Sequence, residues 1–416
     1  MTAAKLFHPL TLPHGSTVPN RLAKAAMEEN MADHDHAPSA ELIALYRAWA
    51  EGGVGLMVTG NVMVDRRAMT GPAGVVLEDD RHLERFTEWA RTARRGGGQV
   101  WLQLNHPGRQ VFANMQQPTL APSAVALELG AASSRFGVPR EMTESDIQDV
   151  MGRFTRSAVL AAQAGFSGVQ IHAAHGYLLS QFLSPLVNRR TDAWGGTPER
   201  RARLLLDTVR SVRAAVPAGF GVAVKLNSAD FQRGGFSPED AQAVVRSLND
   251  LQVDFVELSG GSYEAPAMQG QARDGRTLAR EAYFLEFAQE MAAVARMPLM
   301  VTGGIRRREV AQQVLDGGVA LVGMATALAI EPRLPQQWQA GADPVPQLAP
   351  ITFRNKVLGS LATMAMVRHQ LQRLGRGRAT TPHMAPWRAL VEDQLRLALR
   401  THHYRRWMAQ RAQDLA

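Results

Sequence analysis

The sequence has 416 residues, of which 45% are apolar and 20% are charged, so the chain can bury a large core. It contains no cysteine, which excludes disulfides, thiolate zinc sites, a cysteine nucleophile and an iron–sulfur cluster held by this chain. The formal net charge is +8, but nearly all the cations are arginines and no nucleic-acid-binding motif accompanies them, so we expect no nucleic-acid partner.

The hydropathy pattern gives no sign of a membrane segment. No stretch approaches about 18 consecutive apolar residues, and the N-terminal MTAAKLFHPL lacks the basic-then-apolar order of a secretory signal. We therefore expect a cytoplasmic protein without a membrane partner.

Eight short apolar or alternating segments along the chain predict β-strands. They span residues 21–27, 54–60, 99–105, 168–173, 221–227, 253–259, 298–303 and 319–324. Amphipathic stretches with helix start signals lie between them, for example after Ser39, Thr143 and Ser237. This regular alternation favours parallel strands joined by helical crossovers. Eight strands favour an α/β fold with a single closed (β/α)8 TIM barrel over an open doubly wound sheet.

Two segments do not fit the repeat of strand and helix. Residues 106–142 follow the third strand, are long for a strand-to-helix link and are rich in proline, so we expect a lid over the C-terminal ends of the strands. Residues 351–416 form an Arg- and His-rich tail with helical patterns at 353–374 and 387–407. The predicted organisation is therefore a barrel at 1–350 and a basic helical C-terminal extension. We expect the Leu and Trp residues of the extension to pack on the barrel or on a neighbouring subunit, with its arginines solvated.

Polar residues gather where the predicted strands end, which is where TIM barrels place their catalytic groups. The fourth strand leads into HAAHGY, which brings His172, His175 and Tyr177 within one turn. Two imidazoles and a phenol suit the binding of an anionic oxygen and the delivery of a proton. The His-x-x-His spacing also fits a metal pair, although no third ligand stands at an obvious strand end and the DHDH loop at 33–36 is expected to be exposed. A purely structural role for the histidines is the third interpretation.

Further residues at the same strand ends predict an anion site. Lys225 ends the fifth strand in a chain that uses arginine for nearly every other cation, which indicates either a cation facing an anionic ligand or a salt-bridged wall residue. Gly303 and Gly304 follow the seventh strand, and Gly323 lies in the eighth. Barrels often bind phosphate at this place through backbone N–H groups and a helix N-terminus.

Three longer runs make the chain resemble the Old Yellow Enzyme family of flavin oxidoreductases. They are NRLAKAAM at 20–27, LQLNHPGRQ at 102–110 and GFSGVQIHAAHGYLLSQFLSPLVNRRTDAWGGTPERRARLL at 165–205. The resemblance covers about residues 5–340, which is the whole predicted barrel. It implies FMN bound across the C-terminal ends of the strands, with NAD(P)H as the electron donor.

By this resemblance, flavin-binding residues come from six of the strands. These residues lie at the C-terminal ends of the strands or just after them, and they are Ala25, Ala26, Met27, Glu28, Gly60, Gln103, Lys225, Gly303, Gly304, Ala325 and Thr326. Gln103 is expected to bond to the pyrimidine edge of the flavin, while the two glycines and Thr326 are expected to face its phosphate.

The resemblance also implies the chemistry of an ene-reductase acting on a small activated alkene. His172 and His175 would bind the carbonyl oxygen of an α,β-unsaturated substrate, so that hydride from flavin N5 reaches the β-carbon and Tyr177 protonates the α-carbon. A phenol has a reference pKa of about 10 and is therefore a protonated donor at neutral pH. The lid, Asn30 and Asn105 are implied to select the substrate.

The sequence departs from the pattern of the family in three places. Glu28 stands where the family usually has Cys, Thr or a similar small residue. If Glu28 is ionised, it disfavours the anionic reduced flavin and lowers its potential. If Glu28 is protonated, it can donate a hydrogen bond instead. Lys225 replaces the usual Arg beside the flavin, which keeps the charge and loses the planar fork. Ala325 and Thr326 replace the usual Gly-Arg at the phosphate, so either another arginine compensates or FMN binds more weakly.

The sequence therefore predicts an FMN-dependent NAD(P)H oxidoreductase of the ene-reductase type, homo-oligomeric and without a metal. Two alternatives stay open. The first is a flavin-binding barrel with lost or altered reductase activity, motivated by Glu28 and Thr326. The second is a metal-dependent barrel hydrolase or lyase with His172 and His175 as metal ligands.

Overall fold

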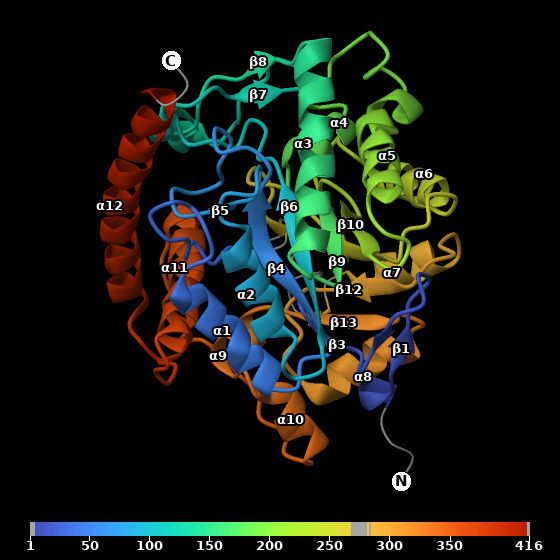
Figure 1. Ribbon diagram of the computed structural model, residues 1–416, viewed down its shortest axis with the longest axis vertical. Coiled ribbons are helices and arrows are strands. Elements are labelled where there is room, and N and C mark those ends of the chain that lie inside the picture. The colour runs from blue at the N-terminus through green and yellow to red at the C-terminus, as the bar shows by residue number, and fades with distance from the viewer. Residues whose placement is uncertain (1–4, 268–280, 283, 414–416) are drawn as a thin grey trace.

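A closed barrel of eight parallel strands forms the centre of the protein (Figure 1). The structure, a computed structural model, describes residues 5–267, 281–282 and 284–413. The barrel closes because the first strand pairs with both the second and the last. In chain order the strands are β3 (Leu22–Lys24), β4 (Leu56–Met63), β6 (Gln99–Asn105), β9 (Gly168–Ala173), β10 (Gly221–Asn227), β11 (Phe255–Ser259), β12 (Leu299–Val301) and β13 (Leu321–Met324). The predicted TIM barrel and its eight strands are confirmed, and β3 is shorter than predicted.

Helices surround the barrel and connect its strands (Figure 1). They are α1 (Ala40–Glu51), α2 (Leu83–Ala93), α3 (Glu144–Gln163), α4 (Leu178–Leu183), α5 (Pro198–Ala215), α6 (Pro238–Leu248), α7 (Leu285–Ala292), α8 (Arg308–Asp316), α9 (Thr326–Ile330) and α10 (Leu334–Gln339). Ser39, Thr143 and Ser237 each accept a hydrogen bond from a backbone N–H in the first turn of α1, α3 and α6. The predicted helix starts are therefore N-caps.

An apolar plug fills the half of the barrel at the N-terminal ends of its strands. It consists of inward-facing side chains from the strands, including Trp101 and Phe255, whose rings lie 5.0 Å apart. The hairpin of β1 (Leu10–Thr11) and β2 (Thr17–Val18) adds Leu12 and Val18 to this cluster. Because side chains alternate along a strand, the next inward-facing layer lies two residues further on, and that layer is polar. The plug therefore confines a ligand site to the C-terminal ends of the strands.

The predicted lid region contains two short strands and two 3-10 turns. The strands β7 (Leu120–Ala121) and β8 (Arg140–Glu141) pair in parallel. The turn η2 (Ala113–Met115) precedes β7, and η3 (Gly130–Arg135) lies between β7 and β8. A further short strand, β5 (Val75–Val76), pairs in parallel with the end of β4. Arg109 Nη2 donates to Glu264 Oε2 at 2.5 Å, which ties the lid to the loop after β11.

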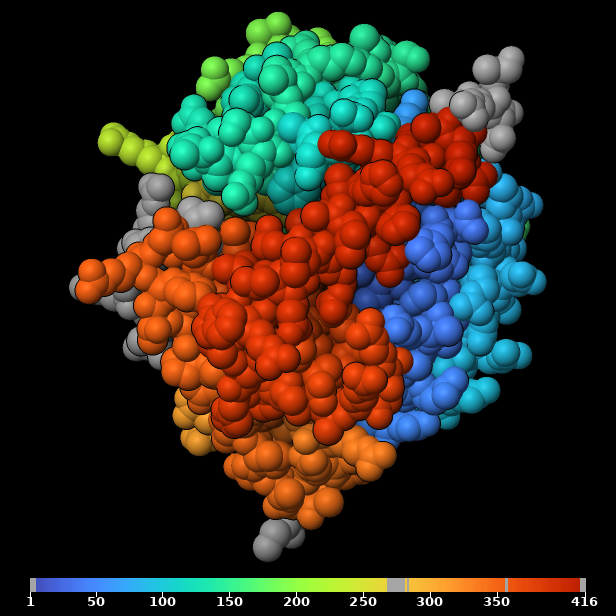
Figure 2. Space-filling model, turned by 90° about the vertical axis from the view of Figure 1, so that its left-hand side faces the viewer, coloured from blue at the N-terminus to red at the C-terminus, as the bar shows by residue number. Residues whose placement is uncertain are grey.

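The C-terminal extension consists of α11 (Lys356–Gly375) and α12 (Pro386–Gln413). The two helices pack on each other, while α11 also contacts α1 and α9, and α12 also contacts η2. Figure 2 shows the extension, in red, spread over one face between the lid and the N-terminal segment. In the described part of the chain, no helix combines the length and the apolar character that a membrane span needs.

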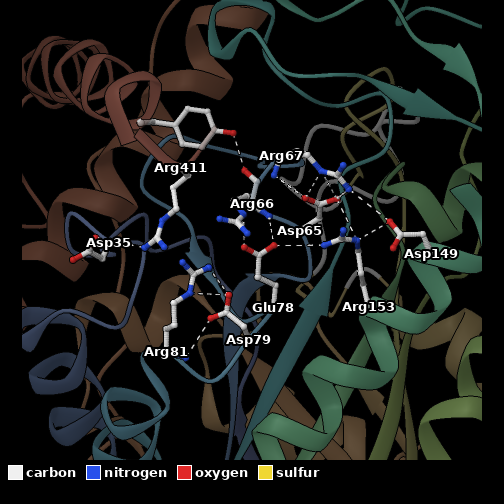
Figure 3. Close-up of polar contacts among 11 residues, drawn as sticks. Asp35, Asp65, Arg66, Arg67, Glu78, Asp79, Arg81, Asp149, Arg153 and Arg411 are labelled. Atoms are coloured by element: carbon white, nitrogen blue, oxygen red, sulfur yellow. Dashed lines mark hydrogen bonds and ion pairs between the residues drawn. The ribbon is translucent and has the colours of Figure 1, made fainter. Parts of the chain in front are cut away.

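The end of α12 is fixed to the loops that follow β3 and β4. The Tyr404 phenol donates to the backbone oxygen of Arg66 at 2.7 Å, and Arg411 pairs with Asp35 at 3.9 Å (Figure 3). Trp407 and Tyr404 also pack over His36, which is 3% exposed. The expectation that the whole 33–36 loop is exposed is therefore wrong for His36, because α12 covers it.

Candidate active site

A cavity of about 640 Å³ opens at the C-terminal ends of the barrel strands. Its volume lies within the range of about 300–1,000 Å³ that is typical of cofactor and ligand sites. The barrel contributes Ala25, Ala26, Met27, Glu28, Asn61, Gln103, His172, His175, Tyr177, Lys225, Ser259, Tyr263, Thr302, Gly303, Gly304, Arg306, Arg307, Ala325 and Thr326. Helix α11 contributes Thr363, Met364, Val367 and Arg368. Most of the residues predicted for the site are thus brought together on one face.

Three predicted residues do not line the cavity, namely Gly60, Asn30 and Asn105. The register of β4 against β6 shifts between Val58 and Asn61, so the bulge turns Asn61 toward the cavity in place of Gly60. A Cβ at Gly60 would lie 1.8 Å from Glu29 Oε2, so the glycine is required by packing behind the wall.

His172 presents its Nε2–H to the cavity. The backbone N–H of Ala174 donates to His172 Nδ1 at 3.2 Å, which leaves Nδ1 as the lone-pair nitrogen and places the proton on Nε2. Burial, followed by the nearby His175 and Lys225, lowers the pKa of His172 well below its usual value. The ring is therefore a neutral hydrogen-bond donor at neutral pH.

His175 is held by a tight turn after β9. Its backbone N–H donates to Asn227 Oδ1 at 3.0 Å, and both His175 and Gly176 have positive φ angles, of 61° and 71°. Its Nε2 lies 2.7 Å from Ser259 Oγ. A hydrogen donated by that hydroxyl places the ring proton on Nδ1. Burial and then Lys225 lower the pKa of His175, so this ring is neutral as well.

Tyr177 completes the group. Its ring lies 4.8 Å from the His172 ring, and its hydroxyl lies 3.2 Å from the Tyr263 hydroxyl and also hydrogen-bonds the Asn61 side chain. Burial, the neighbouring Tyr263 and then Glu28 raise the pKa of Tyr177 well above 10, so it keeps its proton. The turn thus carries two neutral imidazoles and one protonated phenol.

A polar network forms the floor of the cavity above the apolar plug. Lys225 donates to Glu257 at 2.7 Å, Gln170 donates to the other oxygen of Glu257 at 2.7 Å, and Gln103 Nε2 donates to Gln170 at 2.6 Å. A carboxylate only accepts hydrogen bonds, so Glu257 fixes the direction of every hydrogen bond in this network. Gln103 Oε1 is left as an acceptor without a partner among the described residues. The sequence left two interpretations of Lys225 open, and the residue combines their features, since it lines the cavity and forms a salt bridge with Glu257.

Small and basic residues line the part of the cavity that follows β12. Gly303 and Gly304 have φ angles of 127° and 73°, conformations that L side chains rarely adopt. Arg306 and Arg307 follow them, and the Nε atoms of both donate to Glu281 Oε1, at 2.9 and 2.8 Å. Their remaining N–H groups can bind a phosphate. Arg306 and Arg307 thus line the same cavity as Thr326, where the sequence predicted the loss of one guanidinium contact.

Some lining residues were not predicted from the sequence. Ser259 ends the sixth strand and Tyr263 follows it, so applying the strand-end rule to that strand would have identified them. The arginines that follow Gly303 and Gly304 could also have been identified from the sequence. No sequence pattern identifies Arg368 as a cavity residue, because its position depends on how the extension packs.

Glu28 faces Arg368 across the cavity wall. Arg368 Nη1 lies 3.5 Å from Glu28 Oε2, and Arg368 also makes a two-point ion pair with Asp393. Arg368 is 7% exposed, so the expectation that the arginines of the extension are solvated is wrong for this residue.

Residues 5–343 match the family described as NADH:flavin oxidoreductase / NADH oxidase. The chain belongs to this family. Members of the NADH:flavin oxidoreductase family use FMN with a nicotinamide as reductant, and the cavity fits that cofactor. It offers a free acceptor at Gln103, a lysine beside it, and a glycine-and-arginine end of the kind that binds phosphate.

Related proteins carry the same description. The chain is 42% identical to an NADH-dependent flavin oxidoreductase of Neonectria sp. (strain DH2) over 79% of its own length, but spans only 46% of that protein. It is 38% identical to the NADH-dependent flavin oxidoreductase of Hypocrea jecorina (strain QM6a), covering 79% of the chain and 87% of the relative.

A solved structure supports both the fold and the family. The old yellow enzyme homologue of Zymomonas mobilis is 26% identical, with a TM-score of 0.70 over 82% of this chain and 94% of that one. The family resemblance predicted from the sequence is therefore confirmed, and so is the flavin cofactor.

Proposed function

We propose that this family member uses FMN and NAD(P)H to reduce the activated C=C bond of α,β-unsaturated carbonyl-type substrates. The observation that carries the proposal is the turn at 172–177. It holds two neutral N–H donors and a protonated phenol on one side of the cavity, above the polar floor that suits the flavin.

The two histidines bind and polarise the carbonyl oxygen of the substrate. Negative charge develops on this oxygen as the alkene is reduced, and N–H donors fixed in a buried site stabilise it without reorganising. His172 is oriented by Ala174, and His175 by Ser259 and Asn227. Because both rings are neutral, each keeps a lone-pair nitrogen for its orienting partner and one N–H for the substrate.

Tyr177 is the proton donor. When bound, reduced FMN would supply the hydride that the β-carbon of the substrate accepts. The Tyr177 hydroxyl then gives its proton to the α-carbon, so the C=C bond is exchanged for two C–H bonds. Burial keeps this phenol protonated until charge develops on the substrate.

The names of the relatives favour NADH as the electron donor. We propose NADH for this protein too, with NADPH as the comparison in the test. In the described part of the chain, no group of three or more His, Asp or Glu side chains is arranged to hold a metal, so the geometry does not favour the metal-dependent alternative.

The experiment separates the two half-reactions. Protein reconstituted with FMN is reduced anaerobically by NADH or NADPH while the visible flavin absorbance is followed, and is then mixed with enones, nitroalkenes or quinones. We expect NADH to bleach the flavin and enones to restore its absorbance with formation of the saturated product. Reoxidation by quinones alone would contradict alkene reduction and support altered reductase activity. A protein that binds no FMN would contradict the whole proposal.

We also infer that the protein is a homo-oligomer. Trp387, Val391, Leu395 and Leu399 lie four residues apart along α12 and are 51–65% exposed. Side chains at this spacing form one ridge on a helix, and identical ridges from two copies can interdigitate. Exposed apolar side chains that gather on one face are typical of an interaction surface. Light scattering should give a dimer or higher oligomer for the wild type and a smaller species for Leu395→Glu, whereas a monomeric wild type would contradict the inference.

A further inference from the structure

Arg368 links the C-terminal extension to the wall of the cavity. Its Nε and Nη2 atoms donate to the two carboxylate oxygens of Asp393 in α12, at 2.9 and 2.7 Å. This planar two-point contact fixes the orientation of the guanidinium. The Nη1 atom is left pointing at Glu28, whose Oε2 lies 3.5 Å away. The same α11 helix supplies three other residues to the cavity.

Glu28 needs a counter-charge where it lies. It follows β3, only 18% of its side chain is exposed, and its Oε1 is buried without a hydrogen-bond partner among the described residues. A carboxylate in such a place is costly unless a cation pairs with it. Two buried lysines of the barrel already have acid partners, since Lys24 pairs with Glu29 and Lys225 with Glu257.

The charge of Glu28 also acts on two phenols that line the same cavity, Tyr177 and Tyr263. Burial, Tyr263 and then Glu28 act together to raise the pKa of Tyr177, and burial followed by Glu28 raises the pKa of Tyr263. Arg368 acts on Tyr263 in the opposite direction. The charge balance between Glu28 and Arg368 therefore affects the surroundings of Tyr177, to which we assign proton donation.

We propose that Arg368 is a positioning residue of the active site, through which the C-terminal helices orient the Glu28 carboxylate and balance its charge beside the flavin. Asp393 holds Arg368, Arg368 holds Glu28, and Glu28 faces Tyr177. On this proposal the C-terminal extension contributes directly to the active site. The assignment of Tyr177 rests on the proposed function, but the effect on the flavin does not.

The proposal predicts opposite shifts in the reduction potential of bound FMN. Removal of the Arg368 charge leaves Glu28 and Asp393 uncompensated, which disfavours the anionic reduced flavin and makes the potential more negative. Removal of the Glu28 charge makes the potential more positive. The double substitution removes one charge of each sign and returns the potential close to that of the wild type.

The test compares Arg368→Met, Arg368→Lys, Glu28→Gln and the double variant Arg368→Met with Glu28→Gln, all in the full chain loaded with FMN. Arg376→Met is the matched control, because it removes an arginine whose exposed side chain pairs with Glu41 outside the cavity. The midpoint potential is measured by spectroscopic titration. FMN affinity is measured by fluorescence, and limited proteolysis monitors the packing of the extension.

The proposal expects Arg368→Met to lower the potential, Arg368→Lys to restore it in part, and Arg376→Met to leave it unchanged. Equal shifts in Arg368→Met and Arg376→Met would overturn the proposal, because the effect would then be one of net charge alone. If Arg368→Met does not fold, an unchanged potential in Glu28→Gln is sufficient to overturn it. Opposite shifts in a protein that reduces no alkene would uphold this inference and contradict the proposed function.

Discussion

The hydroxyl oxygens of Tyr177 and Tyr263 lie 3.2 Å apart on the cavity wall, so one phenol can donate a hydrogen bond to the other. Only Tyr177 also shares the turn of His172 and His175. We predict that Tyr177→Phe slows reoxidation of the reduced flavin by an enone by about 10²–10⁴-fold, the usual effect of losing a general acid. Stopped-flow absorbance measures this step.

The reductive half-reaction is the internal control for that variant. Flavin reduction by NADH needs no proton from Tyr177 and should keep its wild-type rate. Tyr263→Phe is the matched variant, because it removes a hydroxyl from the same wall and should have a much smaller effect on reoxidation. Equal losses in the two variants, or no loss in Tyr177→Phe, would refute the assignment of the proton donor.

Neutral histidines have a consequence for the pH dependence of the reaction. Burial, with help from Lys225, lowers the pKa of both His172 and His175, so neither ring gains or loses a proton as pH changes around neutrality. We predict a reoxidation rate without a histidine inflection between about pH 5.5 and 8. An inflection near the ordinary histidine value, absent from His175→Asn, would show that a charged imidazole takes part.

Substitution of the histidines should act on the chemical step. Removing one oxyanion donor costs about 10²–10³ in rate in comparable sites. We expect His172→Ala to slow reoxidation by that order while FMN affinity stays near that of the wild type, since His172 belongs to the turn that faces the substrate. A His172→Ala variant that loses FMN and keeps its rate would place the ring at the cofactor instead.

The buried pair of Lys225 and Glu257 predicts a strong effect on stability. Glu257→Gln leaves the lysine cation buried without a carboxylate, and breaking such a pair costs about 3–5 kcal/mol. The double substitution Lys225→Met with Glu257→Gln should recover part of this loss. Denaturant unfolding of the FMN-free protein measures both. Glu41→Gln, which breaks an exposed pair with Arg376, is the control and should have little effect.

Two buried histidines should make the fold sensitive to acid. Burial lowers the pKa of His36 and of His106 to about 4. Below the unfolded value of about 6.5 the unfolded chain takes up a proton that the folded chain does not. The free energy of unfolding is therefore fully retained above about pH 6.5 and falls toward pH 4, by about 3 kcal/mol for each histidine.

His36 allows this prediction to be tested at one site. Its ring lies 4.3 Å from that of Trp407, so protonation should weaken the contact of α12 with the barrel. His36→Leu should show a smaller loss of stability between pH 6.5 and 4, and slower proteolysis of the extension at pH 5, than the wild type. The same acid dependence in both proteins would contradict a role for His36.

Arg306 and Arg307 are predicted to bind the phosphate of FMN. Each charge-assisted hydrogen bond is worth about 1.5–3 kcal/mol, so Arg306→Ala should weaken FMN binding about 10- to 100-fold. Riboflavin has no phosphate, and its affinity should therefore not change. Fluorescence titration of the FMN-free protein with both ligands makes the comparison. An equal loss for FMN and riboflavin would mean that the arginine shapes the cavity and does not bind the phosphate.

The sequence predicted the barrel well because its periodicity is local. Each strand and each N-cap, such as Ser39 and Thr143, is encoded within a few residues. The side chains at strand ends follow from the fold, which is why Gln103, His172 and Lys225 all line the cavity as expected.

The positions that sequence reasoning missed depend on tertiary packing. One extra residue in β4 moves the cavity-facing position from Gly60 to Asn61, and a β-bulge leaves no mark in the hydropathy pattern. The burial of His36 and Arg368 is set by where the two C-terminal helices dock, some 340–370 residues away in the chain from their partners. Only the folded chain brings these groups together.

The fate of the transferred hydrogens tests the central claim most directly. Wild-type protein with FMN is given an enone together with NADH deuterated at its transferable position, and in a second reaction is given unlabelled NADH in deuterated water. The account predicts a saturated product with deuterium from NADH only on the β-carbon and deuterium from solvent only on the α-carbon, as read by NMR. Absence of saturated product, or solvent deuterium on the β-carbon, would contradict it.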